Sequence, residues 1–265
     1  MISPRLVATD LDGTIIRADE TISARTVAAL RRVSDAGAEL VFVTGRPPRW
    51  LAPVAEATGH RGLAICANGA LVYDMTSEQV IDSRLLEATA VRDLMKLLVD
   101  AVPALRFAVE SESDLLHEAS YPLLWDDDQP GVRRAADVAE LSERAAAKLL
   151  VRHSGFDADT LLACAREVVG DLAELTHSSS TGLIEISAVG VTKATTLAAL
   201  CTERGIGADD VLAFGDMPND LAMLAWAGTA YAVANAHQEV LDAVERHTAS
   251  VEDDGVAQVL EELFP

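Results

Sequence analysis

Two aspartates, Asp10 and Asp12, stand directly after a short apolar run near the start of the chain. This run, residues 6–9, predicts a buried strand of a parallel sheet, and Gly13 after it lets the chain turn. Ligands of open α/β sheets bind beyond the carboxyl ends of the strands. Two carboxylates at that point repel each other, so a cation, a shared proton or both must compensate. A lone D-x-D is equally typical of a solvated acidic turn, but D-x-D-G-T after a strand is much more specific.

Other polar groups follow later strands or open a helix. The apolar residues 39–43, 63–67 and 211–214 predict further strands of the same sheet. Because the carboxyl ends of parallel strands meet at one edge of a sheet, the groups that follow these strands can converge. Each group alone also fits an ordinary turn, a helix cap or a solvated side chain. The candidates are Thr44, Arg46, Asn68, Lys193, Asp216 and Asp220.

The order of the predicted elements up to residue 82 is β-α-β-α-β, followed by a hairpin. Helices are expected over residues 23–37 and 47–58, with Ser23 as the cap of the first. This order implies a parallel sheet with right-handed crossovers. The same texture returns near Gly190 with a helix that runs to about Arg204.

A different texture occupies residues 83–185. Amphipathic helices are expected over residues 85–102 and 157–169. We therefore predict an α/β fold with a Rossmann-like parallel-sheet core, residues 1–82 and 186–265, and an inserted α/β domain, residues 83–185. The strands expected in the insertion are 106–110, 114–117, 148–152, 172–177 and 183–186.

The composition narrows the class of protein. Half of the 265 residues are hydrophobic, which is enough for one large domain or two smaller ones. The formal net charge of -21 repels nucleic acid and anionic membranes, so neither is an expected partner. Three scattered cysteines favour free thiols in a reducing cytoplasm over disulfides or a zinc site. We expect no signal peptide and no membrane-spanning segment, and a monomer or a homodimer is compatible with the sequence.

Four segments together resemble the motifs of the haloacid dehalogenase superfamily of phosphotransferases, in order and in spacing. The D-G-V at Asp254 to Val256 is similar to the Cof-type subfamily, which inserts a large α/β cap between the second and third motifs. Residues 83–185 lie at that place. Two departures are small, because Ala194 and Ala234 stand where glycine is common. The motifs are D-L-D-G-T at Asp10 to Thr14, T-G-R at Thr44 to Arg46, G-V-T-K at Gly190 to Lys193 and G-D-M-P-N-D at Gly215 to Asp220.

The resemblance implies phosphoryl transfer through an aspartyl-phosphate. Asp10 would be the nucleophile, and Asp12 would protonate the leaving oxygen and later take a proton from water. Mg²⁺ would be held by the carboxylates of Asp10 and Asp216 and by the backbone carbonyl of Asp12, with Asp220 behind them. Catalytic and phosphate-holding roles would also fall to Thr44, Gly45, Lys193 and Asn219, and weaker substrate contacts to Arg46, Asn68 and Gly69.

The expected function is hydrolysis of a small phosphorylated metabolite, such as a sugar phosphate or a similar phosphomonoester. Two alternatives remain open. One is a sugar phosphomutase of the same superfamily. The other is a receiver-like module that is phosphorylated on an aspartate without catalysis, although such modules have about half this length.

Substrate choice would depend on the inserted cap. Its polar and aromatic candidates are His117, Trp125, Arg152 and His153. The acidic run from Asp126 to Asp128 is interpreted as solvated, with a second metal site as the lesser alternative.

Overall fold

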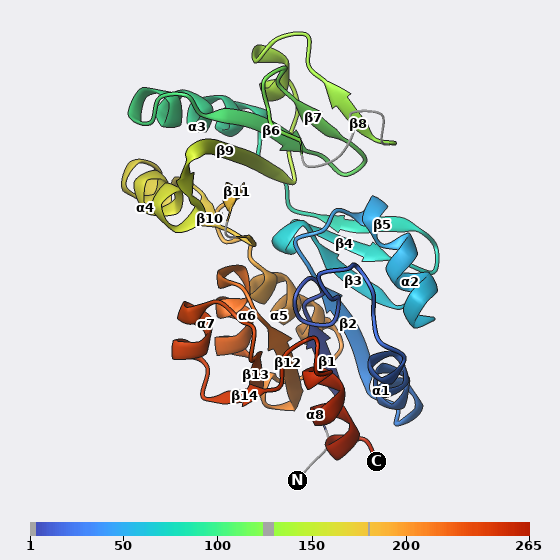
Figure 1. Cartoon of the computed structure of the whole chain (residues 1–265). Coiled ribbons are helices and arrows are strands. Elements are labelled where there is room, and N and C mark those ends of the chain that lie inside the picture. Colours follow the sequence, from blue (N-terminus) through green and yellow to red (C-terminus); the bar gives the residue numbers. More distant parts are fainter. Residues whose placement is uncertain (1–3, 124–129, 180) are drawn as a thin grey trace. The chain divides into compact units, whose positions relative to one another are not determined.

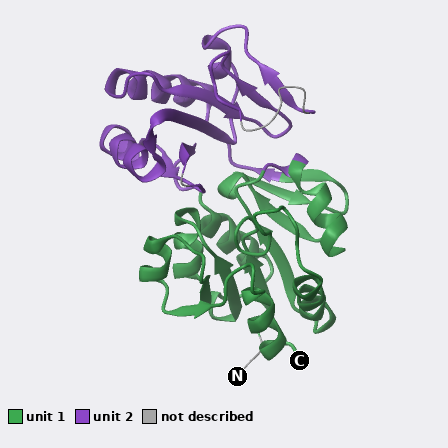
Figure 2. Cartoon of the chain, viewed as in Figure 1, with its two compact units in different colours: residues 1–46, 50–81, 192–265 green, residues 47–49, 82–191 purple. Residues whose placement is uncertain are grey.

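The computed structural model describes residues 4–123, 130–179 and 181–265 (Figure 1). The chain forms two compact units, which differ in their sheets and cores (Figure 2). The predicted α/β class, with a largely parallel core sheet and a second α/β unit, is confirmed. Trp125 and the acidic run Asp126 to Asp128 lie outside the described residues. The core unit comprises Met1–Arg46, Trp50–Ile81 and Thr192–Pro265, and the inserted unit comprises Pro47–Arg49 and Asp82–Val191.

The core unit is built on an eight-stranded sheet of order β14-β13-β12-β1-β2-β3-β4-β5. Strands β14 to β3 in this order run parallel, and β4 pairs antiparallel with β3. Since β12 and β2 flank β1, the ends of these three strands are neighbours, and Asp216, Asp10 and Thr44 follow them. The strands are β1 (Leu6–Thr9), β2 (Glu39–Val43), β3 (Leu63–Cys66), β4 (Leu71–Asp74), β5 (Gln79–Ser83), β12 (Val211–Gly215), β13 (Thr229–Val233) and β14 (Arg246–Thr248).

Helices pack on the core sheet (Figure 1). Leu6 and Val41 belong to a hydrophobic cluster that also contains side chains of α5, α6 and α7. Val7 and Phe42 alternate with them along the strands and therefore point to the opposite face. Helix α1 contacts β2 and packs against α8. The helices are α1 (Ala24–Asp35), α2 (Ala52–Thr58), α5 (Lys193–Glu203), α6 (Leu221–Trp226), α7 (Gln238–Ala243) and α8 (Gly255–Leu263).

The helix expected to start at Pro47 begins later than predicted. Residues Pro48–Trp50 form a 3₁₀ turn, and α2 begins at Ala52. Proline has no N–H and is tolerated only in the first turn of a helix. A helix running from Pro47 would place Pro53 in its interior, so the chain begins a new helix with Pro53 in its first turn.

The inserted unit has a six-stranded sheet of order β10-β11-β9-β6-β7-β8. Neighbouring strands pair antiparallel except β7 and β8, which are parallel. Side chains of α3 and α4 share one hydrophobic cluster with alternate residues of the sheet, such as Val109 and Leu149. The elements are α3 (Ala88–Ala101), β6 (Arg106–Glu110), β7 (Leu115–His117), β8 (Val132–Arg134), β9 (Lys148–Asp157), α4 (Ala158–Val169), β10 (Glu174–Thr176) and β11 (Thr181–Ser187).

The strands β8, β9 and β10 of the insertion differ from the prediction. β9 continues to Asp157, because its polar second half pairs with β11 around an irregularity between Thr181 and Leu183. β10 begins only at Glu174, since Gly170–Leu172 form a 3₁₀ turn. β8 was not predicted, because the short run V-R-R lacks an apolar strand pattern.

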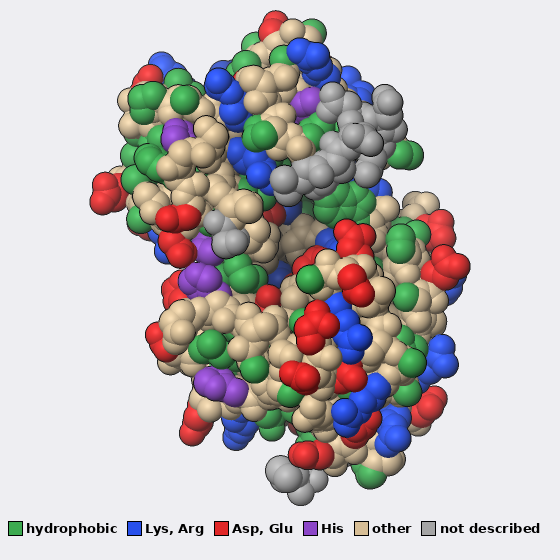
Figure 3. Space-filling model, in the orientation of Figure 1, with side chains coloured by type: hydrophobic (Ala, Val, Ile, Leu, Met, Phe, Trp, Pro, Cys, Tyr) green, Lys and Arg blue, Asp and Glu red, His purple; other side chains and the backbone are tan. Residues whose placement is uncertain are grey.

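The chain surface carries interspersed acidic and basic side chains over the face seen in Figure 3. This is the pattern of a solvated surface rather than of one concentrated patch. The cysteines, all among the described residues, form no disulfide, and Cys66 and Cys201 are buried. Within the described part of the chain, no helix has both the length and the apolar character needed to cross a membrane.

Gly69 lies in the turn after β3, where that turn packs against the start of α5. Its φ is +107°, and a Cβ built on it would lie 2.3 Å from the carbonyl oxygen of Thr192. Thr196 Oγ1 donates a hydrogen bond of 2.7 Å to the Gly69 carbonyl oxygen. Gly69 therefore lets the turn after β3 approach the first turn of α5, directly beside Lys193.

We expect Gly69→Ala to lower the free energy of unfolding by about 2–5 kcal/mol, the sum of left-handed strain and overpacking. Gly205→Ala is the control, because Gly205 also has positive φ but has no atom within 4 Å of the built Cβ. It should lose only the strain, about 1–2 kcal/mol. Urea unfolding measures both, and an equal loss for the two variants would contradict the close-approach argument.

Candidate active site

A buried lysine joins two aspartates at the carboxyl edge of the core sheet. Lys193 Nζ donates to Asp10 Oδ1 at 2.6 Å and to Asp220 Oδ1 at 2.7 Å. The Lys193 and Asp220 side chains are fully buried, and that of Asp10 is 7% exposed. A charge this deep requires partners, so the two ion pairs hold β1, the loop after β12 and α5 together.

The local sequence explains how Lys193 reaches this place. Thr192 caps α5, because its side chain accepts a hydrogen bond of 3.1 Å from the Thr195 N–H. In return, Thr195 Oγ1 accepts one of 3.0 Å from the Thr192 N–H. This capping box fixes the start of the helix and places Lys193 in its first turn. Ala194, where glycine was expected to be common, follows within the same helix without disturbing it.

Asp216 completes an acidic cluster with Asp10 and Asp220. These three residues each offer a carboxylate oxygen, and the three oxygens lie within 4.8 Å of one another. Thr14 Oγ1 donates to Asp216 Oδ1 at 3.0 Å. Gly13 lies so close that a Cβ there would be 2.3 Å from Asp216 Oδ2. The glycine of the D-x-D-G-T segment is therefore needed for the loop after β1 to pass this carboxylate.

Burial and the neighbouring charges shift the pKa values of the side chains in this acidic cluster. Burial raises the pKa of the Asp216 carboxyl to about 9, and repulsion from Asp10 and Asp220 adds to the rise. Burial also raises the pKa of Asp10, against the attraction of Lys193. Although burial opposes the charge of Lys193, the two carboxylates outweigh it and raise its pKa. A carboxyl with a pKa near 9 keeps a proton at neutral pH unless a cation takes the proton's place.

The cluster fits a divalent cation. One lysine cannot neutralise three carboxylates, so two negative charges remain when all three are ionised. Asp220 Oδ2 accepts hydrogen bonds from the backbone N–H groups of Asp216 and Met217, at 3.0 and 3.1 Å, while its Oδ1 accepts from Lys193. Asp220 is thus occupied, and Asp10 and Asp216 are the better ligands. Mg²⁺ is commonly held in this way, by one or two carboxylates with waters and phosphate completing its shell.

Asp12 is turned toward a different partner. Arg46 Nε and Nη2 donate to its two carboxylate oxygens at 2.8 and 2.5 Å. The Asp12 side chain is 55% exposed and that of Arg46 is 17% exposed. The two aspartates that look equivalent in sequence therefore have different environments, one buried on a lysine and one at the surface on an arginine.

The end of β2 contributes a second group of polar atoms. Thr44 is fully buried, and its Oγ1 accepts a hydrogen bond of 3.0 Å from the Arg46 N–H. Asn219 Nδ2 donates to Asn68 Oδ1 at 3.1 Å, and a Cβ on Gly45 would lie 3.2 Å from that oxygen. Asn219 Oδ1 is buried and has no hydrogen-bond partner among the described residues. Thr44, Gly45, Asn68 and Asn219 thus come together as the sequence suggested, whereas Gly69 packs against α5.

Two of the candidates in the inserted unit, His117 and Arg152, both lie near Tyr121. His117 is buried, with Nδ1 2.9 Å from the carbonyl oxygen of Glu118. Arg152 is buried beside Tyr121, whose hydroxyl accepts from Arg152 Nε at 3.3 Å. The ring of His153 lies 4.3 Å from that of Phe156.

Two buried ion pairs of the inserted unit escaped the sequence analysis. Arg49 donates to both carboxylate oxygens of Glu110, at 2.5 and 2.9 Å. Lys148 pairs with Glu185 from the neighbouring strand. Glu110, Lys148 and Glu185 alternate with the strand residues of the hydrophobic cluster, so they share the other face of the sheet. The polar positions within K-L-L-V-R and L-I-E-I were the available signal.

Comparison with known proteins places the chain in a family. A family of haloacid dehalogenase-like hydrolases matches residues 7–260. The chain is 26% identical over 249 residues to pyridoxal phosphate phosphatase YbhA of Escherichia coli, covering 90% of this chain and 91% of that one. It is 27% identical over 261 residues to 5-amino-6-(5-phospho-D-ribitylamino)uracil phosphatase YcsE of Bacillus subtilis, covering 97% and 94%.

Solved structures agree at the level of the fold. A haloacid dehalogenase-like hydrolase from B. subtilis superimposes with a TM-score of 0.85 at 22% identity, covering 98% of this chain and 99% of that one. The subclass IIB sugar phosphatase BT4131 gives a TM-score of 0.82 at 20% identity, covering 97% and 98%. The resemblance seen in the four motifs is confirmed, and the chain belongs to the haloacid dehalogenase-like hydrolases.

Proposed function

We propose that this hydrolase releases inorganic phosphate from a small phosphorylated metabolite, a sugar phosphate or a similar phosphomonoester, through an aspartyl-phosphate on Asp10. The observation that carries the proposal is the buried contact of Lys193 with Asp10, beside Asp216. The named phosphatases among the relatives support the reaction class. We also propose action in the cytoplasm, because reduced cysteines without a disulfide are typical of that compartment.

In the first step, an oxygen of Asp10 forms a bond to phosphorus while the bond from phosphorus to the ester oxygen breaks. The leaving oxygen takes a proton from Asp12. Both oxygens of Asp12 accept from Arg46 in this structure, so at least one must turn from Arg46 to the leaving group. Lys193 holds Asp10 in place for the attack.

In the second step, a water oxygen attacks phosphorus and Asp12 takes the proton of that water. The bond between phosphorus and Asp10 breaks, phosphate leaves and the carboxylate of Asp10 is restored. Asp12 thus returns to the protonated state in which it entered the first step. Its carboxylate form exists between the two steps, and Arg46 is placed to hold it then. Proton transfer by such a group is typically worth about 10²–10⁴ in rate.

Phosphoryl transfer depends mainly on positioning and on neutralising charge. We assign the phosphoryl oxygens to Thr44, the Gly45 backbone, Lys193 and Asn219. Asp10, Asp216 and the Asp12 carbonyl would hold Mg²⁺, with Asp220 fixing Lys193 behind them. When bound, the ion supplies positive charge that lets an anionic carboxylate approach an anionic phosphate.

Substrate choice we assign to the inserted unit. The face of its sheet that carries Glu110, Lys148 and Glu185 is a candidate for this role, because it places polar groups opposite the hydrophobic cluster. Arg152 belongs to the same strand as Lys148. A screen of phosphorylated metabolites would identify the substrate.

The direct test of the function is release of inorganic phosphate from p-nitrophenyl phosphate and from a panel of sugar phosphates. Asp10→Asn should abolish release from every ester, because it removes the attacking charge. A receiver-like module would acquire phosphate on Asp10 without multiple turnovers, and a mutase would return a phosphorylated isomer instead of free phosphate.

Activity should disappear in chelator and return with Mg²⁺, because the carboxylate cluster cannot accept an anionic substrate without a cation. Ca²⁺ should restore it poorly, since Ca²⁺ prefers looser and higher coordination. Phosphate release measured across a titration of each ion gives the comparison. Full activity in excess chelator would remove the metal from the proposal.

Asp12→Asn should affect two classes of ester differently. An alkyl phosphate has a basic leaving oxygen that needs a proton, whereas p-nitrophenolate leaves as a stable anion. The first-step rate should therefore fall by about 10²–10⁴ on the alkyl ester and far less on the aryl ester. Rapid mixing with the aryl ester measures this step.

The same variant should stall after the first step on the aryl ester, because no base activates the water. A burst of p-nitrophenolate near one equivalent per enzyme is expected, with phosphate trapped on Asp10. Equal losses on both esters, without a burst, would take the acid and base roles away from Asp12.

A further inference from the structure

The D-G-V segment, which the catalytic assignment leaves without a role, forms the start of α8, with Asp254 directly before the helix and Gly255 and Val256 in its first turn. Asp254 has φ 59° and ψ 42°, a left-handed conformation. A Cβ built on Gly255 would lie 1.9 Å from the carbonyl oxygen of Ala249, so no larger residue fits there. Val256 is 1% exposed and anchors the turn in the core. The segment thus holds the Asp254 carboxylate in one place.

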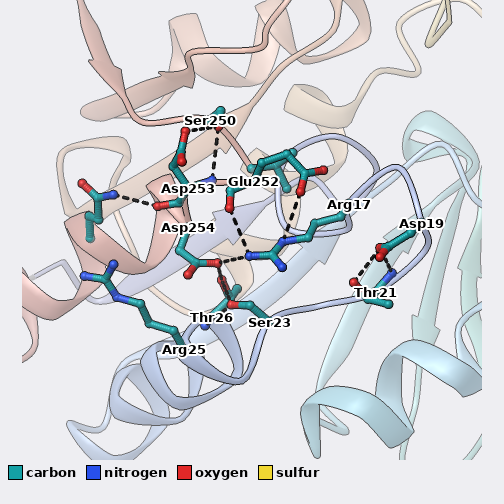
Figure 4. A network of polar contacts seen from close by, with 12 residues as sticks. Arg17, Asp19, Thr21, Ser23, Arg25, Thr26, Ser250, Glu252, Asp253 and Asp254 are labelled. Atoms are coloured by element: carbon teal, nitrogen blue, oxygen red, sulfur yellow. Dashed lines mark hydrogen bonds and ion pairs between the residues drawn. The ribbon is translucent and has the colours of Figure 1, made fainter.

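The Asp254 carboxylate forms an ion pair with Arg17, which lies in the loop after β1 (Figure 4). Arg17 Nη2 donates to Asp254 Oδ1 at 2.9 Å and to the Glu252 carbonyl oxygen at 3.1 Å. The Arg17 side chain is 25% exposed and that of Asp254 is 17% exposed, so the pair is largely shielded from water. Arg17 lies three residues beyond Thr14, which donates to Asp216.

A second contact joins the same two segments closer to the acidic cluster. Asn235 Nδ2 donates to the Gly13 carbonyl oxygen at 2.8 Å. Asn235 Oδ1 accepts from the Val251 N–H, also at 2.8 Å. Asn235 follows Ala234, whose φ is not positive, so the alanine in place of the common glycine leaves this loop unstrained.

The loop after β1 is closed on itself and packed into the core. The N–H groups of Thr14, Ile15 and Ile16 all donate to the carbonyl oxygen of Leu11, and the side chains of Leu11, Ile15 and Ile16 are buried. The bond from Asn235 to Gly13 adds a polar contact to this packing. Gly13 in this turn lies against the carboxylate of Asp216. Thr14 Oγ1 donates to Asp216 from this segment, whereas Lys193 contacts Asp10 and Asp220. The distance between the loop after β1 and Asp216 therefore depends on contacts made by the loop itself.

We propose that Asn235, assisted by the Arg17–Asp254 pair, is a positioning residue that holds the loop after β1 against Asp216 and so sets the affinity of the site for Mg²⁺. This inference rests on the cation of the proposed function. A cluster that is already in place binds a cation without the free-energy cost of assembling it. Removing the hydrogen bonds of Asn235 should therefore weaken Mg²⁺ binding. It should leave the kcat of the Mg²⁺-loaded enzyme nearly unchanged.

The experiment compares three variants of the full chain. Asn235→Ala removes both amide hydrogen bonds. Asp254→Asn removes the charge opposite Arg17 while keeping a residue type that accepts the left-handed conformation. Arg25→Gln is the matched control, because Arg25 joins α1 to Glu261 of α8 by 2.9 and 2.6 Å contacts and does not bond the loop after β1.

Isothermal titration of each folded protein with Mg²⁺, without substrate, gives the binding constant. Asn235→Ala should bind about two- to tenfold more weakly, the effect of losing a neutral hydrogen bond, with a smaller change in the same direction for Asp254→Asn. Arg25→Gln should bind like the unaltered protein. The Mg²⁺ concentration for half-maximal phosphate release should shift by the same factor, and kcat at saturating Mg²⁺ should stay close to its original value.

Unchanged Mg²⁺ binding in folded Asn235→Ala overturns the proposal, and so does an equal loss in the Arg25→Gln control. If Asn235→Ala does not fold, Asp254→Asn decides by the same criterion. If the unaltered protein binds Mg²⁺ but hydrolyses no ester, the proposed function is wrong, and calorimetry still tests the positioning role of Asn235. If the unaltered protein binds no Mg²⁺, both the positioning role and the metal assignment are wrong.

Discussion

The contact of Lys193 with Asp10 and Asp220 is the constraint on which the rest of the core unit depends. A buried ammonium group is costly in free energy, and losing one partner of a buried ion pair typically costs about 3–5 kcal/mol. The chain meets this demand from three places, at residues 10, 193 and 220. The parallel order β12-β1-β2 brings the strand ends together, and the capping box of Thr192 sets the helix that delivers the lysine. Sheet, helix and loop must all be correct for one side chain to be satisfied.

The same contact determines how the carboxylates divide their work. Asp220 gives one oxygen to Lys193 and the other to two backbone N–H groups, so it shapes the loop after β12. Asp216 then lies against Gly13 and accepts a hydrogen bond from Thr14 Oγ1. Asp12, outside this network, bonds Arg46 and stays accessible. Four aspartates that are chemically identical in the sequence thus become a nucleophile, a proton carrier, a metal ligand and a structural support in our proposal because of what surrounds each one.

Much of the core could be predicted because its signals are local. The apolar strands 6–9 and 39–43, the cap Ser23 and the motif order each depend on residues adjacent in sequence. The start of α2 at Ala52 also has a local cause, because Pro53 is placed in the first turn of the helix. The prediction of a helix from Pro47 did not include this effect of Pro53. The pair Arg49–Glu110 was beyond reach, because 61 residues separate its members and either could be solvated. The orientation of Asp12 toward Arg46 and the bond of Asn235 to Gly13 have the same character, since they depend on how finished elements pack.

The strongly negative chain and an anionic substrate present a conflict that the local geometry can resolve. At physiological ionic strength, charges beyond about 8 Å are largely screened, so the net charge of -21 matters less to a bound phosphate than the groups beside it. Those groups include the cations Lys193 and Arg46, yet Lys193 is matched by two aspartates and Arg46 by one. Neither has positive charge to spare. The cation that we propose for the cluster would supply the attraction for phosphate, so that metal affinity, rather than basic side chains, would govern substrate binding. In our proposal, a loop after β1 held at a constant distance from Asp216 sets this metal affinity and, through it, substrate binding.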